Sequence, residues 1–262
     1  MTREEILQDM ARRLSEAGRT RRGMAALTDE AADLTIEEAY RIQLMAVRSK
    51  AGPANRVAGK KIGLTSRAMQ DLLGVFEPDY GHLFSDMEVD NGGVISLSAL
   101  IQPKVEAEVA FLLNRDLTGP GVSVSAVLRA TDAVVPSLEI VDSRIRDWKI
   151  KIQDTVADNA SSARFVLGGR LTRVADLDLS LTGLVFKKNG AILGTAAGAA
   201  VAGHPAAAVA WLANKLAAFE IGLKAGEVVL SGAFLAAVPP AAGDFFEACF
   251  DRLGTVGVRF AG

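Results

Sequence analysis

Cysteine and histidine are scarce in this sequence, and their scarcity limits the chemistry available to it. Cys249 is the single cysteine among 262 residues, so no internal disulfide framework can form and a cytoplasmic location is expected. His82 and His204 are the two histidines, which leaves little material for a zinc site or a catalytic triad. Any metal site in this chain is therefore expected to be made of carboxylates.

Long apolar runs and blocks of positive charge are missing as well. No apolar run reaches the roughly 20 residues of a membrane-spanning helix, and glycine, histidine and proline interrupt the alanine-rich stretch from Thr195 to Ala213. The 29 lysines and arginines are balanced by 31 aspartates and glutamates, so nucleic acid is not an expected partner. The charged N-terminal residues lack the apolar core of a signal peptide. The composition favours a soluble globular protein that acts on small molecules.

Two capping boxes predict helices near the start of the chain. Thr2 with Glu5 precedes an apolar pattern of helical period that we expect to end at Gly18. Thr35 with Glu38 opens a second predicted helix, and a Gly-Pro pair closes it. We find no catalytic motif in these helices.

Strand patterns dominate from residue 57 onward. Alternating or β-branched residues predict strands at 57–64, 94–100, 102–113, 134–141, 184–187, 191–193, 228–230, 245–250 and 256–260. Asn189-Gly190 marks a hairpin, whereas the residues from Glu77 to Gly81 have the composition of a turn. We expect an α+β fold with an N-terminal helical segment, residues 1–56, and a catalytic β-rich domain, residues 57–262.

Two glutamates on the strand at 102–113 are the first candidate site residues. Side chains two apart on a strand share a face, so Glu106 and Glu108 project together with Cα atoms about 7 Å apart. Two carboxylate charges about 5 Å apart repel by roughly 3 kcal/mol at an effective dielectric near 20. A hard divalent cation bound between them would neutralise this repulsion. A solvent-facing edge strand with two charges is the alternative. Glu139 adds a third carboxylate from the strand at 134–141.

Several short motifs follow one another along the chain and together resemble a known family. They are KIGLTS at 61–66, PDYG at 78–81, QPKVEAE at 102–108, PSLE at 136–139, DNASS at 158–162, GHP at 203–205, WLANK at 211–215 and GD at 243–244. From about residue 35 the chain resembles the 2-hydroxypenta-2,4-dienoate (2-keto-4-pentenoate) hydratases of the fumarylacetoacetate hydrolase-like superfamily. The resemblance implies a β-rich, barrel-like roll wrapped by the N-terminal helices. It also implies a homo-oligomer, pentamer or decamer, and association with a neighbouring pathway enzyme.

The resemblance implies a hydro-lyase of aromatic meta-cleavage catabolism. Such an enzyme adds water to 2-hydroxypenta-2,4-dienoate (2-oxopent-4-enoate) and forms 4-hydroxy-2-oxopentanoate. The implied cofactor is Mg2+ or Mn2+, held by Glu106, Glu108 and Glu139. The substrate can chelate such an ion through its carboxylate and the neighbouring C2 oxygen.

The resemblance also implies two catalytic residues outside the carboxylate cluster. Lys61 is the candidate cation for the enolate oxygen or carboxylate, although one of Lys60 and Lys61 must point outward on an alternating strand. Asp79 is the candidate general acid/base or water-orienting group, although an aspartate after proline is also a common turn residue.

Substrate-binding candidates lie in two further motifs. The amides of Leu64 and Thr65 begin a predicted short helix and are candidates for binding the substrate carboxylate. Ser161 is a candidate hydrogen-bond donor, with a satisfied polar loop as the alternative. The sequence leaves several other polar residues without a clear place or role: His82 and Lys151 near the site, His204 as a helix cap, and Cys249 as a packing residue.

Other activities compete with the hydratase. A 4-oxalocrotonate (2-oxo-3-hexenedioate) decarboxylase needs the same electron sink, but no group to handle added water, so Asp79 favours the hydratase. A hydratase of the longer 2-oxo-hept-4-ene-1,7-dioate would require Arg144, Arg146 or another cation at the far end of the pocket. A catalytically silent homologue or a structural cation-binding module would not explain Lys61 together with Asp79.

Overall fold

The computed structural model describes residues 2–66, 70–71 and 74–262, and its strands form two sheets. The predicted short helix with Met69, Leu72 and Leu73 lies mostly outside the described residues. The described helices are α1 (Arg3–Thr20), α2 (Leu27–Glu30), α3 (Ile36–Lys50), α5 (Val124–Ala130), α6 (Ile152–Ala157) and α7 (Pro205–Leu216). None of them has both the length and the apolar character needed to cross a bilayer.

The larger sheet has seven strands within the described residues and carries the predicted carboxylate strand near its centre. Its strands, in spatial order, are β2 (Asp79–Phe84), β1 (Val57–Gly63), β10 (Val228–Leu230), β5 (Lys104–Leu113), β6 (Thr131–Val141), β7 (Ser162–Leu167) and β3 (Glu88–Val89). The neighbours are antiparallel except for β1 with β10 and β3 with β7, which are parallel.

The smaller sheet of the described chain covers the apolar face of the larger one. Its order is β4 (Val94–Ser96), β12 (Gly254–Ala261), β11 (Phe245–Phe250), β8 (Gly183–Lys188) and β9 (Ala191–Ala197). Val105, Ala107, Val109 and Phe111 on one face of β5 are 0% exposed and belong to the core that the two sheets share. The opposite face of β5, which carries the glutamates, is therefore free to form a site.

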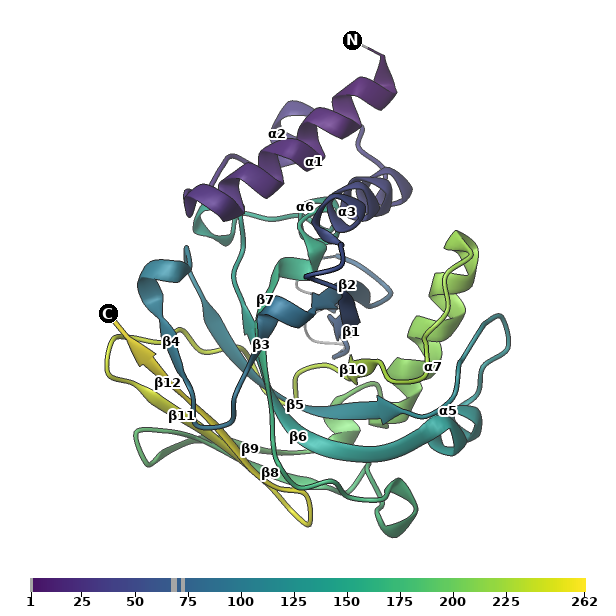
Figure 1. The fold of residues 1–262 in the computed structure, drawn as a ribbon, viewed down its shortest axis with the longest axis vertical. Helices are drawn as coiled ribbons and strands as arrows, with labels where there is room; N and C mark the ends of the chain where they lie inside the picture. The colour runs from purple at the N-terminus through teal and green to yellow at the C-terminus, as the bar shows by residue number, and fades with distance from the viewer. Residues whose placement is uncertain (1, 67–69, 72–73) are drawn as a thin grey trace.

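The N-terminal helices lie above β1 and β2, at the opposite end of the molecule from β8 and β9 (Figure 1). Both predicted capping boxes are present, at Thr2 and Thr35. The predicted end of the first helix at Gly18 is wrong. The helix continues to Thr20 because its closing bonds come later: Arg21 adopts a left-handed conformation (φ 56°), and the amides of Arg21 and Arg22 bond back to Ala17.

The predicted turn from Glu77 to Gly81 is also wrong in part. Asp79 begins strand β2, which pairs with β1 so that Asp79 lies opposite Gly63. Tyr80 is fully buried and stacks on Tyr40 of α3, with ring centroids 4.5 Å apart. Pairing and burial outweigh the turn-like composition here, and the correction places Asp79 on a rigid element. The predicted hairpin at Asn189-Gly190 is confirmed between β8 and β9.

Candidate active site

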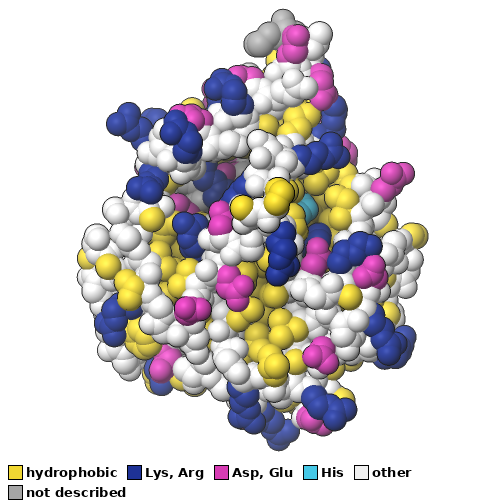
Figure 2. Space-filling model, in the orientation of Figure 1, with side chains coloured by type: hydrophobic (Ala, Val, Ile, Leu, Met, Phe, Trp, Pro, Cys, Tyr) yellow, Lys and Arg dark blue, Asp and Glu magenta, His cyan; other side chains and the backbone are white. Residues whose placement is uncertain are grey.

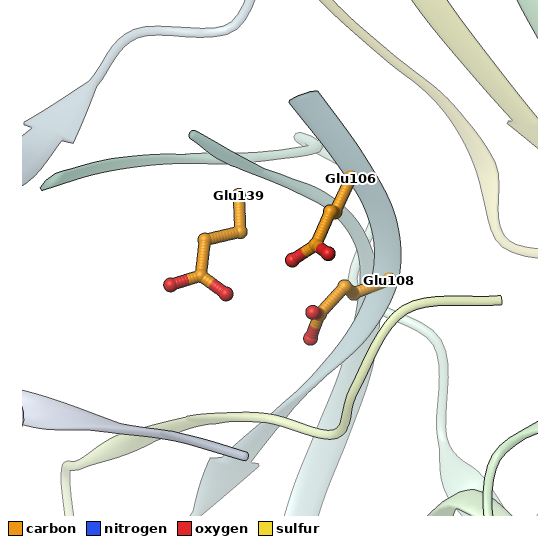
Figure 3. Close-up of side chains that lie close together, drawn as sticks. All are labelled: Glu106, Glu108 and Glu139. Carbon is orange, nitrogen blue, oxygen red and sulfur yellow. The ribbon is translucent and has the colours of Figure 1, made fainter. Parts of the chain in front are cut away.

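Three glutamate side chains converge on the open face of the larger sheet. Glu106 and Glu108 lie two residues apart on β5, and antiparallel pairing places Glu139 of β6 directly opposite Glu106. Oxygen atoms of the three carboxylates lie within 4.8 Å of one another. Figure 3 shows the carboxylates pointing into one space, two from one strand and one from the next. We call these three residues the carboxylate cage.

The donor atoms of the cage fit a hard divalent cation. Glu108 and Glu139 are 0% exposed, Glu106 is partly buried, and β5 lies between two other strands, so the alternative of a solvent-facing edge strand is wrong. One oxygen of Glu108 accepts a hydrogen bond from the Gly232 amide at 2.7 Å. Its other oxygen and Glu139 Oε1 have no hydrogen-bond partner among the described residues, and Glu139 Oε2 has an ion pair with Lys61. Buried anionic oxygens without partners are costly, and an all-oxygen set is what Mg2+, Mn2+ and Ca2+ prefer.

Lys61 brings a positive charge to the edge of the cage. Its side chain is almost fully buried, and its Nζ lies 3.3 Å from Glu139 Oε2 as an ion pair. The ammonium also donates a hydrogen bond to the Ala160 carbonyl oxygen at 3.1 Å. Strand β1 thus supplies a fixed cation beside the carboxylates.

Asp79 faces the same space from the start of β2. Its Oδ2 accepts a hydrogen bond from Thr155 Oγ1 at 3.3 Å, whereas its buried Oδ1 has no partner in the described structure. A Cβ atom on Gly63 would lie 2.2 Å from Asp79 Oδ1 and 3.3 Å from Lys61 Nζ. The absence of a side chain at Gly63 therefore allows the carboxyl group and the ammonium to approach one another.

Leu64 and Thr65 border the cage from the end of β1. Leu64 takes a left-handed conformation (φ 56°), and its carbonyl accepts a hydrogen bond from the Gln70 side chain at 2.9 Å. Thr65 is buried, and its Oγ1 would lie 2.4 Å from a Cβ on Gly232, the residue whose amide binds Glu108. The helix that we predict after Thr65 involves residues 67–69 and 72–73, which lie outside the described residues.

Ser161 lies in the short turn that follows α6, next to the residue that binds Lys61. It is buried, and its Oγ has no partner in the described structure. The peptide before it supplies the carbonyl that binds Lys61. The structure thus brings the turn of Ser161 next to Lys61, with a free hydroxyl available to a ligand.

Comparisons with known proteins identify the family of the chain. No family model matches the chain. The chain is 50% identical over 262 residues to 2-hydroxyhexa-2,4-dienoate hydratase of Comamonas testosteroni, covering 99% of each protein. It is 45% identical over 240 residues to 2-keto-4-pentenoate hydratase 1 of Dechloromonas aromatica (strain RCB), covering 92% of this chain and 91% of that protein. The chain belongs to the 2-keto-4-pentenoate hydratase family.

Solved structures place this family within a wider fold. The 4-oxalocrotonate decarboxylase of Pseudomonas putida G7, complexed with magnesium and adipate, has a TM-score of 0.95 and 39% identity. The match covers 99% of this chain and 98% of that one. Fumarylpyruvate hydrolase of Pseudomonas aeruginosa, 13% identical with a TM-score of 0.63, shares the fold over 77% of this chain and 88% of its own. The fumarylacetoacetate hydrolase-like α+β roll is thereby confirmed.

The prediction that Lys60 or Lys61 must be exposed is wrong. The two side chains do point to opposite faces of β1, but both are buried, because Lys60 pairs with Glu227 at 2.8 Å. His82 lies on the Lys60 face of the sheet, where its Nδ1 lies 3.1 Å from Gln43 Oε1. Burial, together with the Lys60 charge, lowers the pKa of His82 to about 3. His82 is a neutral packing residue behind the site.

No hydrogen bond or ion pair in the described structure joins the other basic candidates to the cage. Lys151 is exposed and precedes α6. Arg144 forms an ion pair with buried Asp158 and donates to three backbone carbonyls. Arg146 is exposed and donates to the Gly23 carbonyl at 3.2 Å.

The remaining two residues have local roles. His204 caps α7, as predicted, by accepting the Ala206 amide at 3.0 Å. Cys249 was expected to pack in an apolar strand, but it lies on the partly exposed face of β11. Its Sγ donates to Glu247 Oε1 at 3.4 Å, because alternation gives the buried face to Phe246, Ala248 and Phe250.

Burial raises the pKa of all three cage carboxyls. For Glu139 the nearby Lys61 opposes the effect, and its pKa still rises to about 7. The pKa of Glu108 lies well above its usual range because burial is reinforced by repulsion from Glu139 and Glu106. The pKa of Glu106 is raised by desolvation, with Lys61 opposing the shift. Without a cation, part of the cage is expected to be protonated near neutral pH.

Relative to its Glu139→Gln variant, the metal-free protein is expected to gain stability as the pH falls from about 7.5 to about 5.5; the comparison removes the opposing effect of His82, whose pKa is lowered to about 3 in both proteins. The folded-state pKa of Glu139 rises from 4.5 to about 7, so the folded protein binds this proton more tightly than the unfolded chain does. The ionised Glu139 therefore lowers the free energy of unfolding by about 3 kcal/mol at pH values above its folded-state pKa. This destabilisation disappears as the pH falls toward the pKa of the unfolded chain. Thermal unfolding in EDTA, followed by circular dichroism, measures this trend.

Two controls accompany the pH experiment. Added Mg2+ should raise the unfolding temperature more at the higher pH, where the carboxylates are ionised. Glu139→Gln should lack this gain, because it has no carboxyl group at position 139. A wild-type unfolding temperature that gains nothing over that of Glu139→Gln as the pH falls through this window would contradict the assignment.

Proposed function

We propose that this chain is a metal-dependent hydratase in aromatic meta-cleavage catabolism. Its substrate is 2-hydroxypenta-2,4-dienoate (2-oxopent-4-enoate), and the product after addition of one water is 4-hydroxy-2-oxopentanoate. The observation that carries the proposal is the cage itself: unpaired carboxylate oxygens lie beside one buried lysine and one buried aspartate. Relatives named as hydratases, 45–50% identical over more than nine-tenths of the chain, support it.

Glu106, Glu108 and Glu139 would hold Mg2+ or Mn2+. When bound, such an ion supplies Lewis-acid stabilisation of negative charge on the C2 oxygen of the substrate. Related proteins of this fold have been solved with magnesium and with Mn2+, which supports this choice of ions.

Lys61 would stabilise the negative charge that develops on the substrate. Although burial opposes its ionisation, the charges of Glu139 and Asp79 outweigh that effect and raise the pKa of Lys61. The side chain therefore stays an ammonium at neutral pH. Its position between Glu139 and the Ala160 carbonyl keeps it at the edge of the cage.

Asp79 would act as the general acid/base. Burial raises its pKa, and Lys61 and Thr155 oppose the shift. The unpaired Oδ1 can hold a proton or orient a water molecule. In the proposed sequence the dienol gains a proton at C5 and loses the proton of its C2 hydroxyl, which gives a 2-oxo-3-enoate. Water then adds its hydroxyl at C4, and a proton is delivered to C3, which balances the proton that the water loses.

Leu64, Thr65 and Ser161 would bind the substrate. The backbone amides of Leu64 and Thr65 are proposed donors to its carboxylate. The Ser161 hydroxyl is buried without a partner and is a proposed donor from the opposite wall.

The 4-oxalocrotonate decarboxylase activity is the second candidate. The high structural similarity to the decarboxylase of Pseudomonas putida G7 favours it. Buried Asp79 favours the hydratase, since loss of CO2 from a 2-oxo acid needs no group to handle added water. Among the cations expected at the far end, Arg144 is engaged by Asp158 and Arg146 is exposed. Lys104, whose Nζ lies 4.1 Å above the Trp148 ring centroid, is another cation that can bind a second carboxylate. The longer dioate is therefore one of the substrates to test.

One assay separates these activities. The purified protein with Mg2+ is incubated separately with 2-hydroxypenta-2,4-dienoate, 4-oxalocrotonate and 2-oxo-hept-4-ene-1,7-dioate. We expect loss of the dienol absorbance with the first substrate, and formation of 4-hydroxy-2-oxopentanoate. CO2 release from 4-oxalocrotonate at a higher kcat/KM would instead assign the decarboxylase, and preferred turnover of the dioate would assign the longer-substrate hydratase.

We also infer that copies of the chain assemble in the cytoplasm, with residues 1–56 covering the catalytic domain of residues 57–262. Edge strand β9 supports assembly, because its Ile192 and Leu193 side chains are 65% and 41% exposed. Elsewhere, on the face shown in Figure 2, basic and acidic side chains are interspersed between apolar ones. Size measurement in solution, with Ile192→Lys as the perturbing variant, tests the assembly.

A further inference from the structure

The turn after α6 holds a costly backbone conformation next to the cage. Asn159, Ala160 and Ser161 have φ values of 55°, 49° and 56°, three consecutive residues in the left-handed region and none of them glycine. Residues with a Cβ atom adopt this region rarely, and a run of them persists only where surrounding contacts enforce it. Contacts around the turn must therefore hold these three residues in the left-handed region.

The side chain of Asn159 attaches this turn to strand β2. Its Oδ1 accepts the His82 amide at 2.8 Å, and its Nδ2 donates to the His82 carbonyl at 2.9 Å. The carboxamide thus pairs with the backbone as another strand residue would. Gly81 makes the approach possible, because a Cβ there would lie 2.3 Å from the Asn159 carbonyl oxygen.

The clamped turn presents one carbonyl to the site. Ala160 O accepts the hydrogen bond from Lys61 Nζ at 3.1 Å, while the same ammonium lies 3.3 Å from Glu139 Oε2. Among the described residues, Lys61 therefore has two acceptors, one from the turn and one from the cage. Without the Ala160 carbonyl, the ammonium would depend on Glu139 and compete with a cation for that carboxylate.

We propose that Asn159 is a positioning residue that fixes the turn so that the Ala160 carbonyl, and not the cage alone, holds the Lys61 ammonium. The inference deepens the proposed function and rests on it for the role of the cage. The hydrogen bonds described for the Asn159 side chain go to the His82 backbone and not to the cage, so Asn159 acts through Ala160 and Lys61.

Mn2+ binding to the full-length protein, titrated by the electron paramagnetic resonance of free Mn2+, tests the proposal. Asn159→Ala should weaken Mn2+ binding roughly tenfold, because Lys61 then competes for Glu139. In the Lys61→Met background, Asn159→Ala should cause no further loss, since no ammonium remains to compete. Equal weakening in both backgrounds, or unchanged binding in the single variant, would overturn the proposal.

Asn214 provides a matched control. Its side chain accepts the Val122 amide at 2.8 Å and donates to the Val122 carbonyl at 2.9 Å, the same pair of bonds at a site on α7. Asn214→Ala should lower the unfolding temperature about as much as Asn159→Ala does, but leave Mn2+ binding unchanged. If Asn159→Ala does not fold, Asn159→Asp, which keeps the acceptor for the His82 amide, should weaken binding in the same direction by a smaller factor. Wild-type Mn2+ binding by a folded Asn159→Asp would then reject the clamp.

Hydratase kinetics add a second readout. Asn159→Ala should lower kcat more than it changes KM, because Lys61 acts on charge that develops during the reaction. A kcat equal to that of Asn214→Ala would count against the positioning role. If the wild-type protein hydrates none of the three substrates, the proposed function fails, while the Mn2+ titration still decides the role of Asn159.

Discussion

Glu106→Gln is expected to reduce metal-dependent turnover roughly a thousandfold while leaving the fold intact. Metal ions contribute several kcal/mol to stabilising charge in a transition state, and about 4 kcal/mol corresponds to a thousandfold in rate. Glu106 lies directly opposite Glu139 in the sheet register and completes the set of converging oxygens. Glutamine keeps the shape of the side chain but removes the charge that attracts a hard cation.

The unfolding temperature of the metal-free variant distinguishes a ligand from a structural residue. Glu106 has a raised pKa because of desolvation, so removing its charge should leave the metal-free protein at least as stable as the wild type at neutral pH. Added Mg2+ should then stabilise the variant less than it stabilises the wild type.

Glu247→Gln is the matched control for this experiment. Glu247 is a partly exposed strand residue that pairs with Lys187 at 2.9 Å on the smaller sheet. Its replacement should change neither turnover nor Mn2+ affinity. Full activity of Glu106→Gln at saturating and at limiting Mg2+ would remove Glu106 from the proposed ligand set.

The cage was the part of the site that could be predicted most readily from the sequence. The period of two in a strand is enough to place Glu106 and Glu108 on one face, and Val105 with Ala107 on the other. Glu139 was expected on a second strand, but its position opposite Glu106 depends on a sheet register that no local pattern specifies. The family resemblance, not periodicity, suggested that the three belong together.

The burial and secondary structure of the residues around the cage depend on contacts with residues distant in the sequence. Lys60 is buried because Glu227, distant in the sequence, pairs with it, so alternation alone gave the wrong exposure. Asp79 was expected in a turn, yet pairing with β1 makes it a strand residue.

The sequence also does not show which atoms come close to a given glycine, because those atoms belong to residues distant in the chain. Gly63 and Gly81 allow contacts with Asp79 and Asn159, and a glycine in a motif does not reveal what approaches it. Asn159 lies within the DNASS motif at 158–162, but the two hydrogen bonds that join its side chain to β2 appear only in the structure.

Asp79→Asn is expected to lower kcat by roughly a thousandfold with Mn2+ affinity unchanged. General acid/base groups contribute about a hundredfold to ten-thousandfold, and asparagine cannot carry the proton. The amide oxygen of asparagine can still accept the Thr155 hydroxyl, so the local geometry should persist. Because burial raises the pKa of Asp79, removal of this carboxyl should not destabilise the protein at neutral pH.

Asp154→Asn provides the opposite pattern as a control. Asp154 is a fully buried aspartate on α6 that accepts both the amide and the hydroxyl of Thr28, at 3.1 and 2.8 Å. Its replacement should lower the unfolding temperature but retain kcat when assayed well below that temperature. A thousandfold loss in Asp79→Asn with no loss of stability, beside this control, would separate chemistry from folding, whereas an unchanged kcat would remove Asp79 from the mechanism.

Solvent deuterium incorporation then distinguishes the two roles proposed for Asp79. If Asp79 only orients the attacking water, Asp79→Asn should still ketonise the dienol and incorporate deuterium at C5 while hydration stops. If Asp79 delivers the proton, enzyme-dependent incorporation at C5 should fall together with hydration. The buried Oδ1, which has no partner in the described structure, favours the second outcome, because burial raises the pKa of Asp79 and so favours the form that can donate a proton.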